Sequence, residues 1–303
     1  MKVNNKTENA DKDIVKEFTL TDIDTSFNCY NQFVNLYAQL KEVDFDSIKI
    51  NLRDWFGANM SAVLGGILDK ISFTNSISIS SNKSQVITIL KKNTFLANYG
   101  YEITPDTNGT TIKYLKLAPS ASRYFNSYVM NELLSQSALP EMSDELKKKI
   151  AESIYEIFVN AQIHSQTDHI YTCGQFFPAK HKIEFTIVDM GLGFKNIINN
   201  RFKDADISLS SIQAIKWALI DGNTTKTDVP GGLGLSLLTK FIKLNNGKFQ
   251  IISDDGFYEV GATEQAYTLD APFPGTIVNM EFRTDDLNSY RLSSEAYNTD
   301  DIF

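Results

Sequence analysis

A helical stretch of the sequence places three chemically active side chains four residues apart, namely Glu156, Asn160 and His164. At about 100° per residue, side chains with this spacing lie on successive turns along one edge of an α-helix. Mg2+ prefers oxygen ligands and keeps several waters, so the Asn160 amide oxygen together with phosphate oxygens would form an adequate metal site. Glu156, one turn away, could orient or deprotonate the group that attacks a phosphate. The alternative is that Glu156 and Asn160 only decorate a solvated helix face.

A second motif, Asp189-Met190-Gly191-Leu192-Gly193, directly follows the strand-like segment KIEFTIV. An ionised Asp189 only accepts hydrogen bonds, so it can bind an amino group such as that of adenine. The two glycines let the backbone approach a ligand closely. A plain turn at the end of a strand is the alternative interpretation.

Glycines supply the third motif, because Gly231, Gly232 and Gly234 occupy three of four positions just before the apolar run LSLLTKFIKL. The free N–H groups and the positive dipole end of the predicted helix suit phosphate oxygens. Simple helix capping does not need three glycines. Lys226, in the preceding loop, could reach a phosphate, although an isolated loop lysine is more often solvated.

Apolar periodicity predicts the elements of the N-terminal half. Helices and strands alternate there over about one hundred residues, which indicates an α/β domain. We predict a helix over 27–40, a strand around 48–52, a helix following residues 55–60, a strand around 77–79 and helical sequence over 85–100.

In the C-terminal half, apolar residues recur every three or four positions from Leu146 to Ala161, with Ser143 available as N-cap, so a long amphipathic helix is predicted. The segments HIYTCGQFF and KIEFTIVD, separated by PAKH, predict an antiparallel hairpin. FQIIS and FYEVG predict a second hairpin around residues 254–256, and TIVNMEF a closing strand. A further helix is predicted over Ile212–Ile220.

Length and composition limit the class of protein. A chain of 303 residues is too long for one ordinary core. We therefore expect an α/β domain over 13–120, a second domain over 121–283 and a polar tail over 284–303.

A net charge of -8 offers no basic field for a nucleic-acid backbone. Cys29 and Cys173 are too far apart in the sequence for a CxxC pair, and no signal-like or membrane-spanning run occurs, so we expect reduced thiols and a cytoplasmic location.

Together the three motifs resemble the gyrase, heat-shock-chaperone, histidine-kinase and mismatch-repair family of ATP-binding domains, called the GHKL or Bergerat fold. The resemblance covers about residues 130–283. It implies a two-layer α/β sandwich with a mixed sheet, a mobile lid between the glycine motifs, and ATP and Mg2+ as ligands. The implied roles are magnesium ligand for Asn160, catalytic carboxylate for Glu156, adenine reader for Asp189 with support from Thr276, and nucleotide-contacting backbone for Gly191, Gly193, Gly232, Leu233 and Gly234.

The N-terminal half resembles, less strongly, the STAS domains of sulfate transporters and anti-sigma-factor antagonists. The resemblance rests on IKINLRDWFGANMSAVLGGIL, a strand, a polar turn and an apolar helix. Regulatory STAS domains carry a phosphorylated hydroxyl near this helix start, where Ser61 is the nearest candidate, but the usual Asp-Ser pair before a glycine is absent.

These resemblances imply an ATP-dependent regulatory protein, a slow ATPase switch coupled to a STAS-like domain that meets a protein partner. Two alternatives stay open: a serine/threonine kinase of the anti-sigma type, and a scaffold that binds nucleotide without turnover. Neither a nucleic-acid partner nor a membrane is expected, and a homodimer is compatible with the family.

Overall fold

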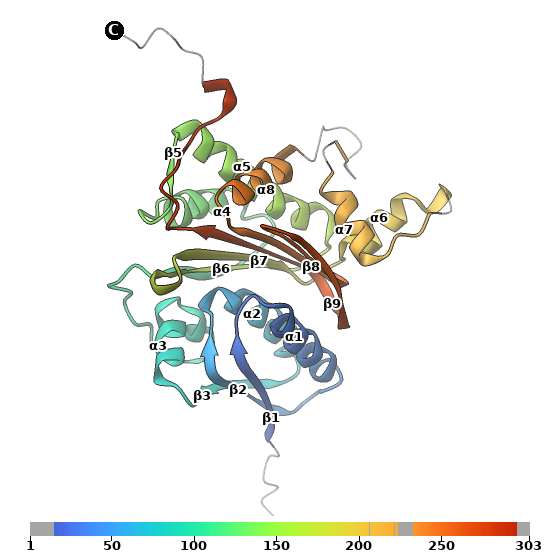
Figure 1. The fold of residues 1–303 in the computed structure, drawn as a ribbon. Helices are drawn as coiled ribbons and strands as arrows, with labels where there is room; N and C mark the ends of the chain where they lie inside the picture. Colours follow the sequence, from blue (N-terminus) through green and yellow to red (C-terminus); the bar gives the residue numbers. More distant parts are fainter. Residues whose placement is uncertain (1–14, 206, 221, 224–232, 296–303) are drawn as a thin grey trace, which may run out of the picture.

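The computed structural model describes residues 15–205, 207–220, 222–223 and 233–295 (Figure 1). Its N-terminal half is a parallel three-stranded sheet in the order β1-β2-β3, with helices between successive strands. The elements of this half are β1 (Val15–Ile23), α1 (Phe27–Leu40), β2 (Ser47–Phe56), α2 (Ser61–Ile71), β3 (Ser76–Ser81) and α3 (Ser84–Lys92).

The C-terminal half is built on a five-stranded sheet in the order β4-β6-β7-β9-β8. The strands of this half, including a short pair formed by β5 and β10, are β4 (Thr111–Leu117), β5 (Glu141–Met142), β6 (Ile170–Phe177), β7 (Lys182–Asp189), β8 (Lys248–Val260), β9 (Glu264–Arg283) and β10 (Ser289–Tyr290). The helices are α4 (Ser122–Tyr128), α5 (Asp144–His164), α6 (Phe194–Arg201), α7 (Ser211–Ala218) and α8 (Leu233–Leu244).

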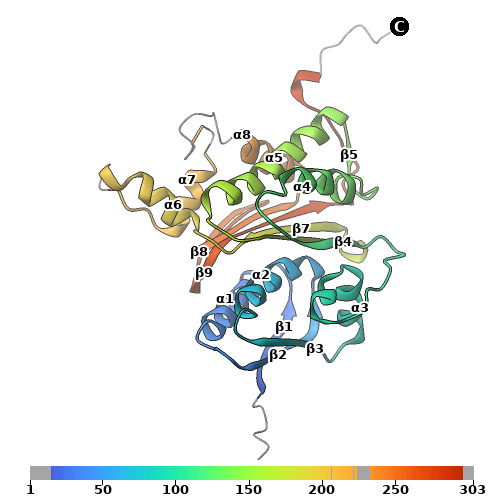
Figure 2. The same cartoon turned by 180° about the vertical axis from the view of Figure 1, so that it is seen from behind.

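Figures 1 and 2 show that the five-stranded sheet lies between two layers of helices. Helices α4, α5 and α8 cover one face, where Phe185, Phe249 and Met280 are fully buried. Helices α1 and α2 of the N-terminal half cover the other face. The sheet thus belongs to two hydrophobic clusters, one on each side.

The face toward the N-terminal half is unusually polar for a buried surface. Its side chains are less than a tenth exposed and include Gln175, Glu184, Thr186, Gln250, Asn279 and Glu281. The N-terminal half supplies their partners: Thr25 Oγ1 donates to Glu184 at 2.7 Å, and Asn59 Nδ2 donates to Thr186 Oγ1 at 3.1 Å. Because buried polar groups are stable only when they are paired, these contacts fix how the two halves dock.

Glycines allow α2 to lie directly on the sheet. A Cβ at Gly65 would overlap the Tyr114 hydroxyl, and one at Gly66 would lie 3.0 Å from Met190 Sδ. Met190 follows Asp189 in the second sequence motif, so α2 lies directly behind that motif. The apolar helix predicted after residue 60 is therefore an interface helix as well as a core helix.

Replacing Gly65 with alanine should push α2 away from the sheet, because Tyr114 is buried and cannot easily move. We expect the free energy of unfolding in urea to fall by about 2 kcal/mol, as is typical of overpacking. Adding Tyr114→Leu should recover part of that loss. Wild-type stability of the Gly65→Ala protein would contradict the close approach.

Several sequence predictions are confirmed. The predicted helix over 27–40 is α1, the N-cap Ser143 accepts a hydrogen bond from Leu146 N at 3.1 Å, and β6 and β7 form the antiparallel hairpin. Cys29 and Cys173 are both buried free thiols. Among the described residues, every helix is too short or too polar to span a bilayer.

Other predictions differ from the structure. Every strand pair in the five-stranded sheet is antiparallel, whereas a mixed sheet was expected there. Strand β4 pairs with β6, although a boundary at residue 120 would assign it to the first half. The segments FQIIS and FYEVG do not form a hairpin, because both lie in β8 and the residues between them form a bulge with Asp254 at φ 53. In the expected tail, β10 pairs with β5.

Candidate functional site

Helix α5 carries the first motif, and its sequence explains its position. Ser143 caps its N-terminus, and Asp144 and Glu145 in the first turn complement the helix dipole. A buried stripe that includes Ile150, Ile154, Ile157, Phe158 and Ala161 faces the sheet. Glu156, Asn160 and His164 lie at the edge of this stripe and are partly buried, as their spacing predicted.

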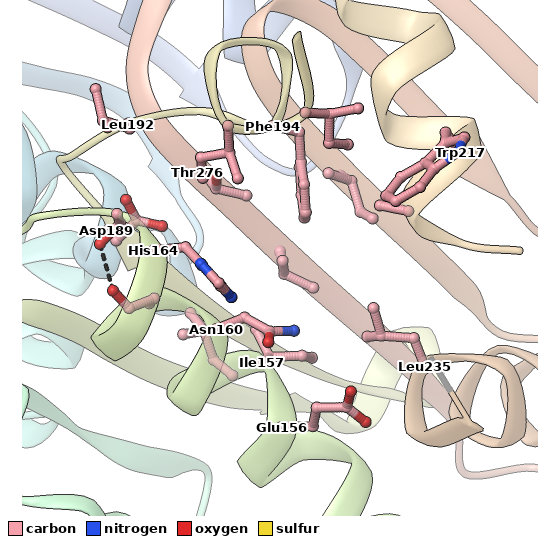
Figure 3. Close-up of a pocket in the computed structure, with 18 of the residues that line it drawn as sticks. Glu156, Ile157, Asn160, His164, Asp189, Leu192, Phe194, Trp217, Leu235 and Thr276 are labelled. Carbon is pink, nitrogen blue, oxygen red and sulfur yellow. Dashed lines mark hydrogen bonds between the residues drawn. The ribbon is translucent and has the colours of Figure 1, made fainter. Parts of the chain in front are cut away.

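These three side chains line one pocket together with Asp189 and Thr276 (Figure 3). The pocket lies between α5, the five-stranded sheet, the α6–α7 segment and the start of α8, and its empty volume is about 930 Å³ including its open mouth. Its apolar lining comes from Ile157, Ala161, Ile187, Leu192, Phe194, Ile197, Ile198, Trp217, Ala218, Leu235, Ile251 and Val278. An apolar pocket with a few convergent polar groups is the usual form of a small-molecule site.

Asp189 is a strongly perturbed titratable group of this pocket. Burial raises its pKa from 3.8 to about 7, against the lowering effects of the Gly191 N–H, the Ser165 and Thr276 hydroxyls and the charge of Lys70. Gly191 N donates to Asp189 Oδ1 at 3.0 Å. Thr276 lies directly opposite Asp189 in the β7–β9 ladder, which explains why its hydroxyl reaches the carboxyl group.

The glycines of the second motif are required by packing within the protein. A Cβ at Gly191 would overlap the Ser165 carbonyl oxygen, and one at Gly193 would lie 2.5 Å from Ser253 Oγ. Leu192 N donates to Ser165 O at 2.6 Å. Gly191 and Gly193 themselves line a second hollow on the side of α1, beside Tyr37. Their close approach is thus to neighbouring elements, whereas Leu192 and Asp189 face the pocket with Thr276.

Helices α6 and α7 form the pocket wall opposite α5. Asn199 joins them through two hydrogen bonds, donating to Leu209 O at 2.9 Å and accepting from Leu209 N at 2.7 Å. A capping box at Ser210 starts α7. From α7 Trp217 reaches the pocket, held by an edge-to-face contact with Phe202 at 5.5 Å between ring centroids (Figure 3). The sequence predicted only α7 in this segment, and α6 is an additional helix.

The third motif is described in part. Gly231, Gly232 and Lys226 lie outside the described residues. Helix α8 begins at Leu233, includes Gly234, and contributes Leu235 to the pocket. The apolar run that follows the glycines therefore forms a helix, as predicted, and Leu235 of this helix lines the pocket.

Among the described lining residues, the charged side chains are two carboxylates, Glu156 and Asp189, and no lysine or arginine is present. A polyanionic ligand held there would need a cation or backbone N–H groups to offset this negative field. Within the described part of the chain, no cluster of three or more His, Cys, Asp or Glu side chains could hold a metal. The Asn160 amide oxygen is a donor of the kind that magnesium accepts, with the remaining ligands taken from phosphate and water.

Sequence reasoning did not find some residues of the site. Ser165, which contacts Asp189, and the apolar wall of Phe194 and Trp217 were not identified. Asn223 also lines the pocket, and its side chain donates to Trp217 O at 2.8 Å. Helical spacing of Trp217 on α7 could have indicated that it faces inward, but nothing in the sequence locates the surface that it faces.

Comparisons of the sequence with protein-family models and with curated proteins gave no match.

Proposed function

We propose that the chain is a magnesium-ATP-binding regulatory protein of the GHKL type, with slow ATP hydrolysis as its activity. One observation carries the proposal: Glu156, Asn160, Asp189 and Thr276, drawn from three distant stretches of sequence, line a single pocket. Residues chosen from the sequence for complementary roles in nucleotide binding would not be expected to meet in one cavity by chance.

The base would bind at the Asp189 end of the pocket. A carboxylate there accepts from the amino group of adenine, and the surrounding apolar residues Ile187, Leu192 and Val278 pack on the ring. A guanine base would present an oxygen acceptor to the same carboxylate. Two acceptors facing each other in a buried site are unfavourable, so the site should prefer adenine.

The phosphates would bind toward Asn160, Glu156 and the start of α8. Bound Mg2+ would neutralise phosphate charge and hold the phosphate group in place, with the Asn160 amide oxygen as its protein ligand. Glu156 then lies one turn along the same helix edge, where it can orient a water for attack on the terminal phosphorus and accept its proton, while the bond to the bridging oxygen breaks and ADP leaves.

Regulation would pass through the β8–β9 hairpin, which lies between α1 and the lid helix α7 (Figures 1 and 2). On one side, Phe27 of α1 packs edge-on against Phe257 of the hairpin, with ring centroids 5.5 Å apart. On the other side, the Ser211 hydroxyl of α7 lies within hydrogen-bond distance of the carboxylates of Asp254 and Asp255. A nucleotide that moves α7 would therefore act on the same strands that hold the N-terminal half.

The N-terminal half would be the partner-binding unit, in keeping with its resemblance to STAS domains. Ser61 is not its phosphoacceptor in this conformation, because the residue is fully buried and its hydroxyl accepts from Asn93 Nδ2 at 3.0 Å. A regulatory protein that recognises this half would respond to the nucleotide state through its contacts with the hairpin. A protein-kinase activity toward such a partner is the alternative, and product analysis separates the two.

The fluorescence of Trp217 tests the proposed site directly. The chain has two tryptophans, and Trp55 lies elsewhere, so a Trp55→Phe protein reports on Trp217 alone. We expect ATP with Mg2+ to change this emission saturably, with affinity lost by about tenfold or more when EDTA removes the metal. In an Asn160→Ala variant, the affinities for ATP with and without Mg2+ should become similar, because the metal loses its protein ligand.

Incubation with ATP labelled on the terminal phosphate identifies the activity. Free labelled phosphate is the expected product, whereas label transferred to protein would indicate a kinase. If ATP leaves Trp217 emission unchanged up to millimolar concentration, the proposed binding site is wrong.

A further inference from the structure

Ser165 joins two motifs that the proposed function treats as separate. It follows the last residue of α5 and is 2 % exposed. Its hydroxyl contacts the Asp189 carboxyl group. Its carbonyl oxygen accepts from Leu192 N at 2.6 Å. One residue thus holds both the side chain and the backbone of the turn that contains Asp189.

We propose that Ser165 is a positioning residue for base recognition, which sets the orientation of the Asp189 carboxylate and fixes the Asp189–Leu192 turn to the end of α5. This inference rests on the proposed adenine-nucleotide function. It deepens that function, because α5 also carries Asn160 and Glu156. The same helix would then fix the relative positions of the base site and the metal site.

The geometry around Ser165 leaves the turn little freedom. A Cβ at Gly191 would overlap Ser165 O, so the turn lies in direct contact with the end of the helix. Thr167 N donates to Ser165 Oγ at 3.3 Å, and Met190 N donates to Thr167 Oγ1 at 3.3 Å, which adds a second link between the same segments. The residue after the helix is therefore part of the base site.

The single proton of the Ser165 hydroxyl defines its role. Ser165 Oγ lies 2.5 Å from Ala161 O, a carbonyl of its own helix, and also contacts Asp189. A hydroxyl can donate only one hydrogen bond, so it donates either to Ala161 O or to the carboxylate. When Asp189 is ionised, donation to the carboxylate fixes one oxygen and leaves the other for an adenine amino group. Without Ser165, only the Gly191 N–H and the Thr276 hydroxyl would orient the carboxylate.

The expected effect is a loss of base discrimination. We compare ATP with inosine triphosphate, which carries an oxygen in place of the adenine amino group. The wild-type chain should bind ATP at least about tenfold more tightly, because the buried carboxylate has no donor in the inosine complex. Ser165→Ala should lower the affinity for ATP about fivefold, since the adenine complex uses the oriented oxygen. The affinity for inosine triphosphate should stay within about twofold of the wild-type value.

Ser153 provides a matched control in the same helix. It is 1 % exposed, and its hydroxyl donates to Lys149 O at 2.7 Å, the same local bond that Ser165 makes with Ala161 O. Ser153 does not line the pocket. Ser153→Ala should therefore leave both nucleotide affinities unchanged, which separates loss of a buried helix hydroxyl from loss of base positioning.

The test is a set of calorimetric titrations with both nucleotides on wild type, Ser165→Ala, Ser153→Ala, Asp189→Asn and the Ser165→Ala/Asp189→Asn double variant. We expect Ser165→Ala to have no further effect on discrimination once Asp189 is replaced. The inference would be overturned if Ser165→Ala lost affinity for ATP and inosine triphosphate equally, or if its ratio of the two affinities matched the wild-type ratio. If Ser165→Ala does not fold, Ser165→Cys, a weaker donor of similar size, should show an intermediate loss. Absence of ATP binding by the wild type would instead refute the proposed function.

Discussion

Replacing Glu156 with glutamine should lower the rate of ATP hydrolysis at least about a hundredfold and leave the affinity for magnesium-ATP within about threefold. Glutamine keeps the size of the side chain and one oxygen acceptor, but it cannot take a proton from water. Glu156 lines the pocket one helical turn from Asn160, so it can act on a water at the terminal phosphate without contributing to base binding.

The measurement is phosphate release under single-turnover conditions, with binding followed in parallel by calorimetry. Glu152→Gln is the matched control, because Glu152 lies one turn earlier on α5, is exposed and pairs with Lys149 at 2.7 Å. That variant should hydrolyse ATP at the wild-type rate. A Glu156→Gln protein that binds and hydrolyses ATP normally would remove Glu156 from the mechanism.

The second large effect concerns stability. Asp189→Asn should raise the free energy of unfolding of the nucleotide-free protein by about 3 kcal/mol at about pH 8, while it weakens ATP binding. The physical reason is that burial raises the Asp189 pKa from 3.8 to about 7. Above pH 7 the folded protein must hold a buried negative charge, and the asparagine variant does not.

The pH dependence gives this prediction its sign. Between pH 3.8 and about 7 the folded state keeps the Asp189 proton and the unfolded state releases it, so the stability from this group falls as pH rises through that window. The advantage of Asp189→Asn should therefore shrink as pH falls from 7 toward 4. Urea unfolding at several pH values measures it. A stability difference between Asp189→Asn and wild type that is constant with pH, or is zero, would contradict a raised Asp189 pKa. As a control, Asp168→Asn at an exposed position should change the free energy of unfolding by less than about 0.5 kcal/mol.

A gain in stability together with a loss of binding would mark Asp189 as a functional residue. Asparagine could keep the contact with the Gly191 N–H, so stability alone does not favour a carboxylate in a site that disfavours its charge. ATP binding should also weaken as pH falls below about 7, because the adenine amino group prefers the ionised carboxylate. Proton release on binding would be its calorimetric signature.

Local sequence signals predicted the elements around the site well. The apolar spacing of α5 and its Ser143 cap, the β6–β7 hairpin, and the alternation in β2 and β3 each depend on short-range patterns. The edge formed by Glu156, Asn160 and His164 follows directly from helix geometry. These side chains could therefore be assigned to one surface before their surroundings were known.

The missed features depend on long-range contacts. Strand β1 (Val15–Ile23) gives a weak sequence signal because only Leu20 and Ile23 are buried. The bulge at Asp254 looks like a hairpin turn in sequence, because polar residues and Gly256 interrupt the strand. The contact of Ser165 with Asp189 and Leu192 was not predicted, since these partners lie more than twenty residues away in the sequence.

The docking of the two halves could not be predicted for the same reason. Glu184, Thr186 and Asn279 suggest a solvated sheet face when their strands are read alone. They are buried because Thr25 and Asn59 from the other half satisfy them. Only the assembled chain shows that this polar face is an interface, and this arrangement gives the N-terminal half its physical link to the pocket.

A calorimetric titration of the wild-type chain with ATP and with GTP, both with Mg2+, tests the central claim most directly. We predict saturable binding of one ATP per chain, with GTP at least about tenfold weaker because its base offers no amino group to Asp189 at the corresponding position. Absence of saturable ATP binding at millimolar concentration, or equal binding of the two nucleotides, would contradict the account.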